Sequence, residues 1–160
     1  MTAAPAVTAD ADPGLSRAWL APFLLDVPLT LSVHARGAGD PAYATDPSGA
    51  VWRTSLTPDG PGTLRVWSRG ATVTAHTWGP GAGWLLDTLP AQLGFHDDRA
   101  GFAARHPVIG ELALRLAGLR VGRSGRVFEA LVPAVLEQKV VGREAHRAWR
   151  FLLRAYGDPA

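Results

Sequence analysis

The chain of 160 residues contains no cysteine, and Lys139 is the single lysine among its sixteen basic residues. Without cysteine there is no disulfide framework, no thiolate nucleophile and no cysteine-bound zinc or iron–sulfur centre. The five histidines show no metal-ligand spacing, so we expect ordinary surface or core positions for them. The sequence therefore predicts no metal site and no cofactor.

Long apolar runs are missing as well. The most apolar early stretch, residues 18–27, contains Pro22 and Asp26 and is far too short to cross a bilayer. Residues 1–11 lack the basic start and the apolar run of a secretory signal peptide. No Gly-x-Gly-x-x-Gly, Walker loop or Gly-x-Ser-x-Gly motif is present. We expect a cytoplasmic protein with no membrane partner.

Charge is unevenly divided along the chain. Residues 1–104 hold six Arg against nine Asp, whereas residues 105–160 hold nine Arg and one Lys against four Glu and one Asp. A basic second half favours a surface that binds a polyanion, although an uneven but merely solvated surface explains the charge equally well.

The first two thirds of the chain read as strands followed by a helix. Residues 1–17, rich in Ala, Pro and Asp, are predicted to form a flexible leader. Residues 27–35 alternate apolar and polar side chains, which predicts a strand, and further strands are predicted at 50–57, 63–68 and 71–78. A helix follows over 84–93, with Gly94 placed to end it. Residues 18–104 are thus predicted to be an α+β domain with an antiparallel sheet.

The remainder, residues 105–160, reads as helical. Helices are predicted over 107–116, with Pro107 in the first turn, over 124–136, with Ser124 as its cap and a kink at Pro133, and over 142–156, ended by Gly157. The fold class predicted for the whole chain is α+β, with the boundary in residues 95–105.

The last helix is strongly two-sided. At about 100° per residue, its arginines fall on one face: Arg143, Arg147, Arg150 and Arg154. The opposite side carries Ala145, Ala148, Trp149, Leu152 and Tyr156. The planar guanidinium donates two hydrogen bonds at once to a phosphate, so the stripe is suited to nucleic acid. A solvated amphipathic helix is the alternative.

Two polar residues precede this helix. Lys139 could act as a Schiff-base nucleophile, contact a phosphate or a groove, or simply be exposed. Gln138 has the donor and the acceptor that reading a base edge requires. Neither Asp97-Asp98 nor the Asp10/Asp12 pair looks like a catalytic dyad. Five tryptophans, Trp52, Trp67, Trp78, Trp84 and Trp149, could stack on bases but are expected in the core.

Residues 106–157 resemble the opening of the helix–hairpin–helix (HhH-GPD) DNA glycosylase domain, in its 3-methyladenine glycosylase II branch. The matching elements are Gly118-Leu-Arg120, Phe128-Glu129, the run from Val135 to Val140, and the Ala-rich helix ending in Tyr156-Gly157. Residues before about 95 are similar to the small β-rich N-terminal domain of the same enzymes, a sheet with helices on one side. Residues 105–160 would then be the first helices of the all-α glycosylase domain.

The resemblance implies roles for particular residues. Gln138 and Lys139 would lie in the loop that enters the minor groove, where the residue after the glutamine fills the gap left by a flipped-out nucleotide. Phe23 would lie in the pocket for the damaged base. The DNA contacts predicted for Arg143, Arg147 and Arg150 come from the arginine stripe and not from the resemblance. Family members commonly have Gly and an apolar wedge where this chain has Glu137 and Lys139.

The activity implied is base excision repair by a hydrolase that flips alkylated purines out of double-stranded DNA and removes them. The family's hairpin motif and catalytic aspartate lie downstream of the matched region, and no segment of residues 1–160 matches either. We therefore expect no catalytic residue in this chain, an N-terminal portion that is inert alone, and a full-length monomer.

Two alternatives remain open from the sequence. One is a non-catalytic nucleic-acid-binding module that uses the arginine stripe. The other is an interaction fragment whose apolar helix face pairs with a missing partner. Because partner helices are lacking, we expect Trp149 and Leu152 to be incompletely buried and the isolated chain to self-associate.

Overall fold

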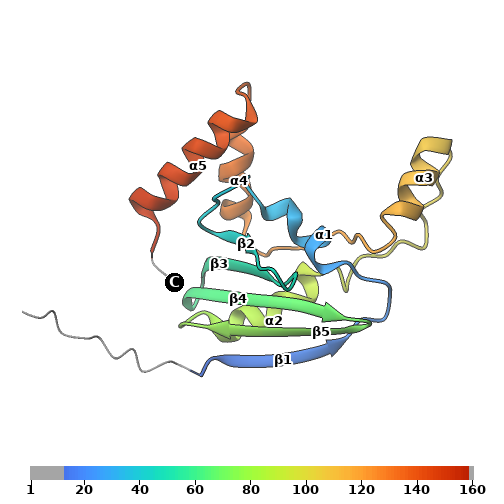
Figure 1. The fold of residues 1–160 in the computed structure, drawn as a ribbon, viewed down its shortest axis with the longest axis horizontal. Helices are drawn as coiled ribbons and strands as arrows, with labels where there is room; N and C mark the ends of the chain where they lie inside the picture. The colour runs from blue at the N-terminus through green and yellow to red at the C-terminus, as the bar shows by residue number, and fades with distance from the viewer. Residues whose placement is uncertain (1–12, 159–160) are drawn as a thin grey trace, which may run out of the picture.

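The computed structural model describes residues 13–158, which form the α+β fold that the sequence predicts (Figure 1). The strands are β1 (Leu15–Leu20), β2 (Tyr43–Thr45), β3 (Val51–Thr57), β4 (Gly60–Arg69) and β5 (Thr72–Trp78). The helices are α1 (Val27–Leu31), α2 (Ala82–Gln92), α3 (Pro107–Arg115), α4 (Val127–Leu136) and α5 (Gly142–Tyr156). All neighbouring strands pair antiparallel in the order β1-β5-β4-β3-β2.

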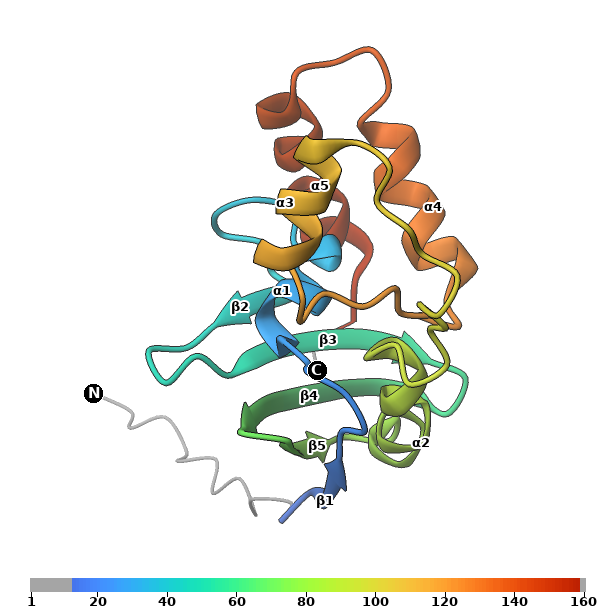
Figure 2. The same ribbon diagram turned by 90° about the vertical axis from the view of Figure 1, so that its right-hand side faces the viewer.

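One face of the sheet carries the core. Alternate residues of β3, β4 and β5 point to it, among them Val51, Leu64 and Val73, and all are almost fully buried. Helices α1 and α2 pack on this face, and α2 contributes Leu85, Leu86 and Leu89. Burying such a side chain contributes about 1.5–3 kcal/mol. Figures 1 and 2 place α3, α4 and α5 on the side of β2 and β3, away from β1.

Two strands of the sheet were missed by the sequence reasoning, β1 and β2. Strand β1 pairs along its whole length with β5, from Leu15 opposite Thr77 to Leu20 opposite Thr72. It takes up the last three residues of the predicted leader, while residues 1–12 lie outside the described part of the chain.

The strand predicted at 27–35 is wrong, because this segment is the helix α1 followed by a 3₁₀ turn over Ser32–His34. The side chain of Asp26 accepts a hydrogen bond from the Leu29 amide at 2.9 Å and so caps the helix. Pro28 suits a first helical turn. The buried residues Val27, Thr30 and Leu31 also fit a helical spacing, which the alternating pattern concealed.

Other boundaries differ by a few residues. Strands β3 and β4 are joined by a tight turn in which Thr57 pairs with Gly60, so part of the predicted loop at 58–62 belongs to β4. Ser124 does not cap α4: the N-cap is Arg126, whose amide donates to the Ser124 hydroxyl at 3.2 Å. Helix α2 ends as predicted, with Gly94 in the left-handed conformation at φ 75°.

The connector between α3 and α4 runs very close to the end of α2. A Cβ atom at Gly122 would lie 1.8 Å from the Gln92 carbonyl oxygen, and the next amide, of Arg123, donates to the Ala91 carbonyl at 2.9 Å. We expect Gly122→Ala to lower the free energy of unfolding by about 2–3 kcal/mol, because the backbone has to move apart.

Urea denaturation followed by fluorescence measures this loss. Gly110→Ala is the matched control: it lies inside α3, where a Cβ atom would make only an ordinary contact with Ala104 Cβ at 3.9 Å. That substitution should instead stabilise by about 0.5–1 kcal/mol through its better helix propensity. Equal effects at the two positions would contradict the close approach at Gly122.

Candidate nucleic-acid interface

The turn between α4 and α5 presents the two polar residues that the sequence singled out. Helix α4 ends with Glu137 as its C-cap and α5 begins after Val141, and the turn between these helices can be followed in Figure 1. Gln138 and Lys139 lie in this turn, and both are exposed. Lys139 has φ 56°, and among residues 13–158 it alone adopts a positive φ without being glycine. Such a conformation costs a side-chain-bearing residue about 1–2 kcal/mol.

The arginine stripe of α5 divides into two groups. Arg143, Arg147 and Arg154 are exposed, and within the described residues they form no ion pair. Arg150 is half-buried and donates from Nη1 to the Ala38 carbonyl at 3.3 Å. Three of the four guanidinium groups are therefore free to meet a polyanion, whereas Arg150 also holds α5 against the loop before β2.

The other side of α5 packs on the loop of residues 36–40. Trp149 is only 8% exposed, and its indole Nε1 donates to Asp40 Oδ1 at 3.1 Å. Asp40 Oδ2 in turn accepts from the Arg36 amide at 2.8 Å. The expectation that Trp149 lacks cover is therefore wrong, because this loop supplies it, while Leu152 is half-buried as expected. The contact between Asp40 and Trp149 could not be predicted from sequence, because the two residues are 109 positions apart.

A buried ion pair between Arg53 and Glu129 fastens α4 to the sheet. Arg53 of β3 is 7% exposed and donates from Nη2 to Glu129 Oε1 at 2.8 Å and from Nη1 to Gln92 Oε1 at 2.9 Å. The Ser55 hydroxyl donates to the second Glu129 oxygen. Burial lowers the pKa of Arg53, and the charge of Glu129 opposes that shift. This network fixes where the helical half sits on the sheet.

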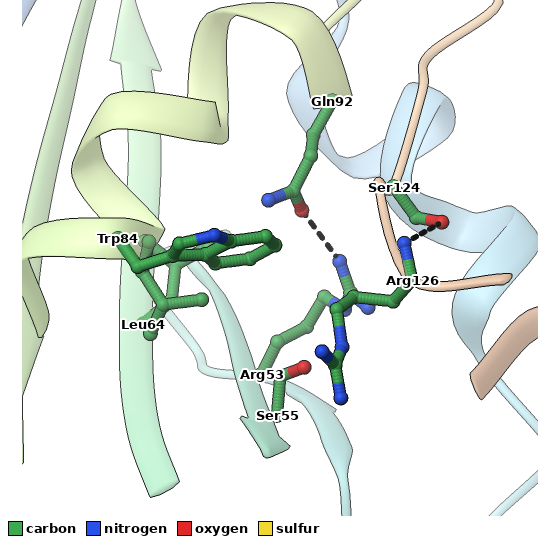
Figure 3. A pocket seen from close by; sticks show the side chains of 8 residues that line it. Arg53, Ser55, Leu64, Trp84, Gln92, Ser124 and Arg126 are labelled. Atoms are coloured by element: carbon green, nitrogen blue, oxygen red, sulfur yellow. Dashed lines mark hydrogen bonds between the residues drawn. The ribbon is translucent and has the colours of Figure 1, made fainter. Parts of the chain in front are cut away.

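Beside this network is a small cavity. Its lining includes Arg53, Trp84 and Arg126, and its volume is about 10 Å³ (Figure 3). A space of that size holds about one water molecule. An extruded purine cannot enter it, so the ion-pair network is a structural joint rather than a base pocket.

Phe23 lies elsewhere, against the core. Its ring meets Phe95 edge to face at 5.5 Å, and the Arg120 guanidinium lies over it at 4.4 Å from the ring centre. Arg120 is held there by the carbonyls of Ala117 and Leu119 at 3.0 and 2.8 Å. These contacts join Phe23 to the end of α2 and to the connector after α3. Its role in a base pocket stays a prediction.

Three of the tryptophans expected in the core lie on the other face of the sheet. Trp52 and Trp78 stack with their ring centres 5.6 Å apart, and the Arg65 guanidinium lies over Trp52 and Trp67. These rings are half-buried, because they cover a sheet face on which α1 and α2 do not pack. Trp84 does pack against the core cluster, and Trp149 is buried under the loop described above.

His34 ends the 3₁₀ turn beside two arginines. Burial lowers its pKa from 6.5 to about 4, and the charges of Arg53 and Arg36 act in the same direction. Because the folded state favours the neutral imidazole, stability should be complete above about pH 6.5 and fall as the pH drops toward 4.

Replacing His34 tests this. We expect thermal unfolding of His34→Gln to depend less on pH between about 6.5 and 4 than that of the wild-type chain. His96→Gln, at an exposed position, is the control and should keep the wild-type profile. A His34→Gln profile as steep as wild type would show that other groups cause the acid loss.

No helix within residues 13–158 is long and apolar enough to span a membrane. In the same part of the chain, no three or more His, Asp or Glu side chains gather as ligands for a metal ion.

Comparison with known proteins adds a likeness in fold. No family profile matches the chain, and no curated protein matches it. Among solved structures it is similar to MBOgg1 in complex with a low affinity DNA ligand, with a TM-score of 0.67 and 16% sequence identity. The alignment covers 92% of this chain and 48% of that chain, so this chain spans about half the length of MBOgg1. At this identity the likeness shows a shared fold.

Proposed function

We propose that this chain binds double-stranded DNA through the α4–α5 turn and the free arginines of α5. The proposal rests on two features that occur together at the α4–α5 turn and in the helix after it. An exposed lysine is held in the left-handed conformation, and the helix that follows presents Arg143, Arg147 and Arg154 without ion-pair partners in the described chain. Neutralising phosphates with such groups releases counterions and drives binding.

The more specific proposal is that the chain forms part of a DNA N-glycosylase that flips out alkylated purines. A nucleotide turned out of the stack leaves a gap, and a side chain that enters it offsets part of the unstacking cost. The methylenes of Lys139 would fill the gap, and its ammonium group would reach a phosphate. Both the sequence resemblance and the fold shared with MBOgg1, which was solved with a DNA ligand, support this proposal.

A non-catalytic DNA-binding module is the second candidate. One observation favours it: the cavity beside Arg53 holds only about 10 Å³, and the larger hollow of about 610 Å³ lies against Arg65 and Trp67 on the sheet rather than beside the α4–α5 turn. The same arginine face would then bind DNA without any chemistry.

Binding and excision together distinguish these candidates. The first measurement is the affinity of the 160-residue chain for an unmodified DNA duplex at several salt concentrations. We expect the logarithm of the binding constant to fall with the logarithm of salt, with a slope of about −3 for three or four phosphate contacts. The second is release of methylated purines from alkylated DNA, by this chain and by a longer gene product. Binding without excision by either supports the module, and absence of binding overturns both candidates.

Lys139 gives a sharper test, because its structural and functional effects have opposite signs. Lys139→Gly should leave stability unchanged or raise it by about 1 kcal/mol, since glycine tolerates a positive φ. The same change should weaken DNA binding several-fold and reduce the salt slope by about one. Lys139→Arg, which keeps the charge, is the control for binding. A glycine variant that binds DNA as well as wild type would remove Lys139 from the interface.

A further inference from the structure

We infer that Glu137 is a positioning residue: the N-terminal sheet unit sets the conformation of the Gln138–Lys139 turn by gripping this carboxylate. The inference rests on the proposed function for what the turn contacts, but the grip itself exists without DNA. Glu137 stands directly before the turn, as the C-cap of α4. Its side chain points back to a segment a hundred residues earlier in the chain, Arg36.

Arg36 is itself fixed in place. Its Nη1 donates to the Val33 carbonyl at 2.6 Å and to the Ala35 carbonyl at 3.1 Å, and its amide donates to Asp40 Oδ2. Its buried Nε makes no hydrogen bond and lies 3.4 Å from Glu137 Oε1. A guanidinium with two of its directions already fixed loses little freedom on meeting a carboxylate, so this ion pair is better placed than most at a surface.

Helix α5 also comes near this carboxylate. His146 Nε2 lies 4.0 Å from Glu137 Oε1, and the same imidazole packs on Gly37, where a Cβ atom would lie 2.4 Å from Nδ1. Residues 36–40 thus touch both ends of the α4–α5 connection, through Glu137 at its start and through Trp149 further along α5. One short loop therefore contacts residues on both sides of the turn, while the turn itself stays exposed.

The contact between Arg36 and Glu137 explains how Lys139 keeps a φ of 56°. A left-handed lysine costs free energy that the turn alone does not repay, and strain of this kind persists only when the surroundings hold it. Glu137 lies two residues before Lys139, and its backbone amide is already tied to the Pro133 carbonyl at 2.9 Å. Fixing the Glu137 side chain to Arg36 therefore restricts the backbone conformations that the turn can adopt.

The first test is made on the free protein, with no DNA present. We expect Glu137→Gln to raise amide hydrogen exchange about tenfold at Glu137 and Gln138, whose amides donate to the Pro133 and Val135 carbonyls, with no change in α2 or the sheet. The charge-swapped pair Arg36→Glu/Glu137→Arg should return exchange toward the wild-type rate. Unchanged exchange in Glu137→Gln, or no recovery in the swapped pair, overturns the inference.

DNA affinity distinguishes the positioning role from a simple charge effect, because the two predict opposite changes for Glu137→Gln. Removing a negative charge beside a DNA-binding face should tighten binding, and we expect that for the control Glu144→Gln, at an exposed position in the first turn of α5. Glu137→Gln should instead weaken binding about three- to tenfold. Tighter binding in both variants would overturn the positioning role. If the wild-type chain binds no DNA, the proposed function fails, while the exchange experiment still decides the grip.

Discussion

Reversing the charges of Arg143 and Arg147 together should reduce the affinity for duplex DNA by about 100-fold at about 50 mM salt. Both side chains are exposed on one face of α5, and neither contributes to an ion pair within residues 13–158. Each lost phosphate contact removes about one unit from the salt slope, and each new carboxylate adds repulsion. We therefore expect the Arg143→Glu/Arg147→Glu variant to show a slope smaller by about two, measured by fluorescence anisotropy from low to moderate salt.

Two controls make this result specific to α5. Arg69→Glu reverses an exposed charge at the end of β4, outside α5, and should change affinity less than threefold. Lys139→Arg should stay near wild type. Reversal of Arg150 is a poorer test, because its bond to the Ala38 carbonyl also supports packing. A double variant with wild-type affinity and normal folding would refute the arginine face as a DNA contact.

The largest loss of stability is expected at the joint between sheet and helices. Glu129→Ala removes the carboxylate that Arg53 faces at 2.8 Å. Within residues 13–158, Gln92 is then the one side chain that still accepts a hydrogen bond from this guanidinium, which is 7% exposed. Breaking a buried pair from one side typically costs about 3–5 kcal/mol. Since Glu129 is partly open to solvent, we expect a loss of about 2–4 kcal/mol, measured by denaturant unfolding.

An exposed pair provides the comparison. Glu111 and Arg115 of α3 lie 3.8 Å apart, with both side chains about 70% exposed. Glu111→Gln should change stability by less than about 0.5 kcal/mol. Equal losses at Glu111 and Glu129 would mean that the joint contributes nothing beyond ordinary surface charge. Glu129→Ala should also loosen α4 and α5 from the sheet, seen as faster amide exchange in both helices.

Local patterns were enough to predict most of the regular elements. Helix α5 was found with its observed ends, because its arginine and apolar stripes repeat at helical spacing and Gly157 follows. Strands β3 and β5 were recognised from alternation and β-branched residues. Residues 27–35 were wrongly predicted as a strand, because their apolar positions are also compatible with a short helix that Asp26 caps. Strands with little apolar pattern of their own, such as β2, were missed because pairing partners define them.

In the candidate site too, local residues could be predicted from sequence and long-range contacts could not. Gln138, Lys139 and the arginines could be named from sequence because they lie in one continuous helix–turn–helix stretch. The groups that hold this stretch could not, because Arg53, Arg36 and Asp40 meet it only after the chain has folded back. Ion pairs across such separations carry no periodic signal in the sequence. The predicted self-association of the chain remains open to sedimentation, and exposed apolar residues such as Phe128 and Phe151 are consistent with it.

The pairing of β1 with β5 has a consequence for how the protein is made. Residues 15–20 are synthesised before residues 72–77, so their partner strand does not exist until those residues have been added. At about 5–20 residues per second, strand β1 waits roughly 3–11 seconds for its place in the sheet. During that time its backbone groups lack their native hydrogen-bond partners and Trp19 lacks its native contacts, so a chaperone that binds nascent chains could bind this segment. A bulky N-terminal fusion would be expected to disturb this late step more than one at the opposite end.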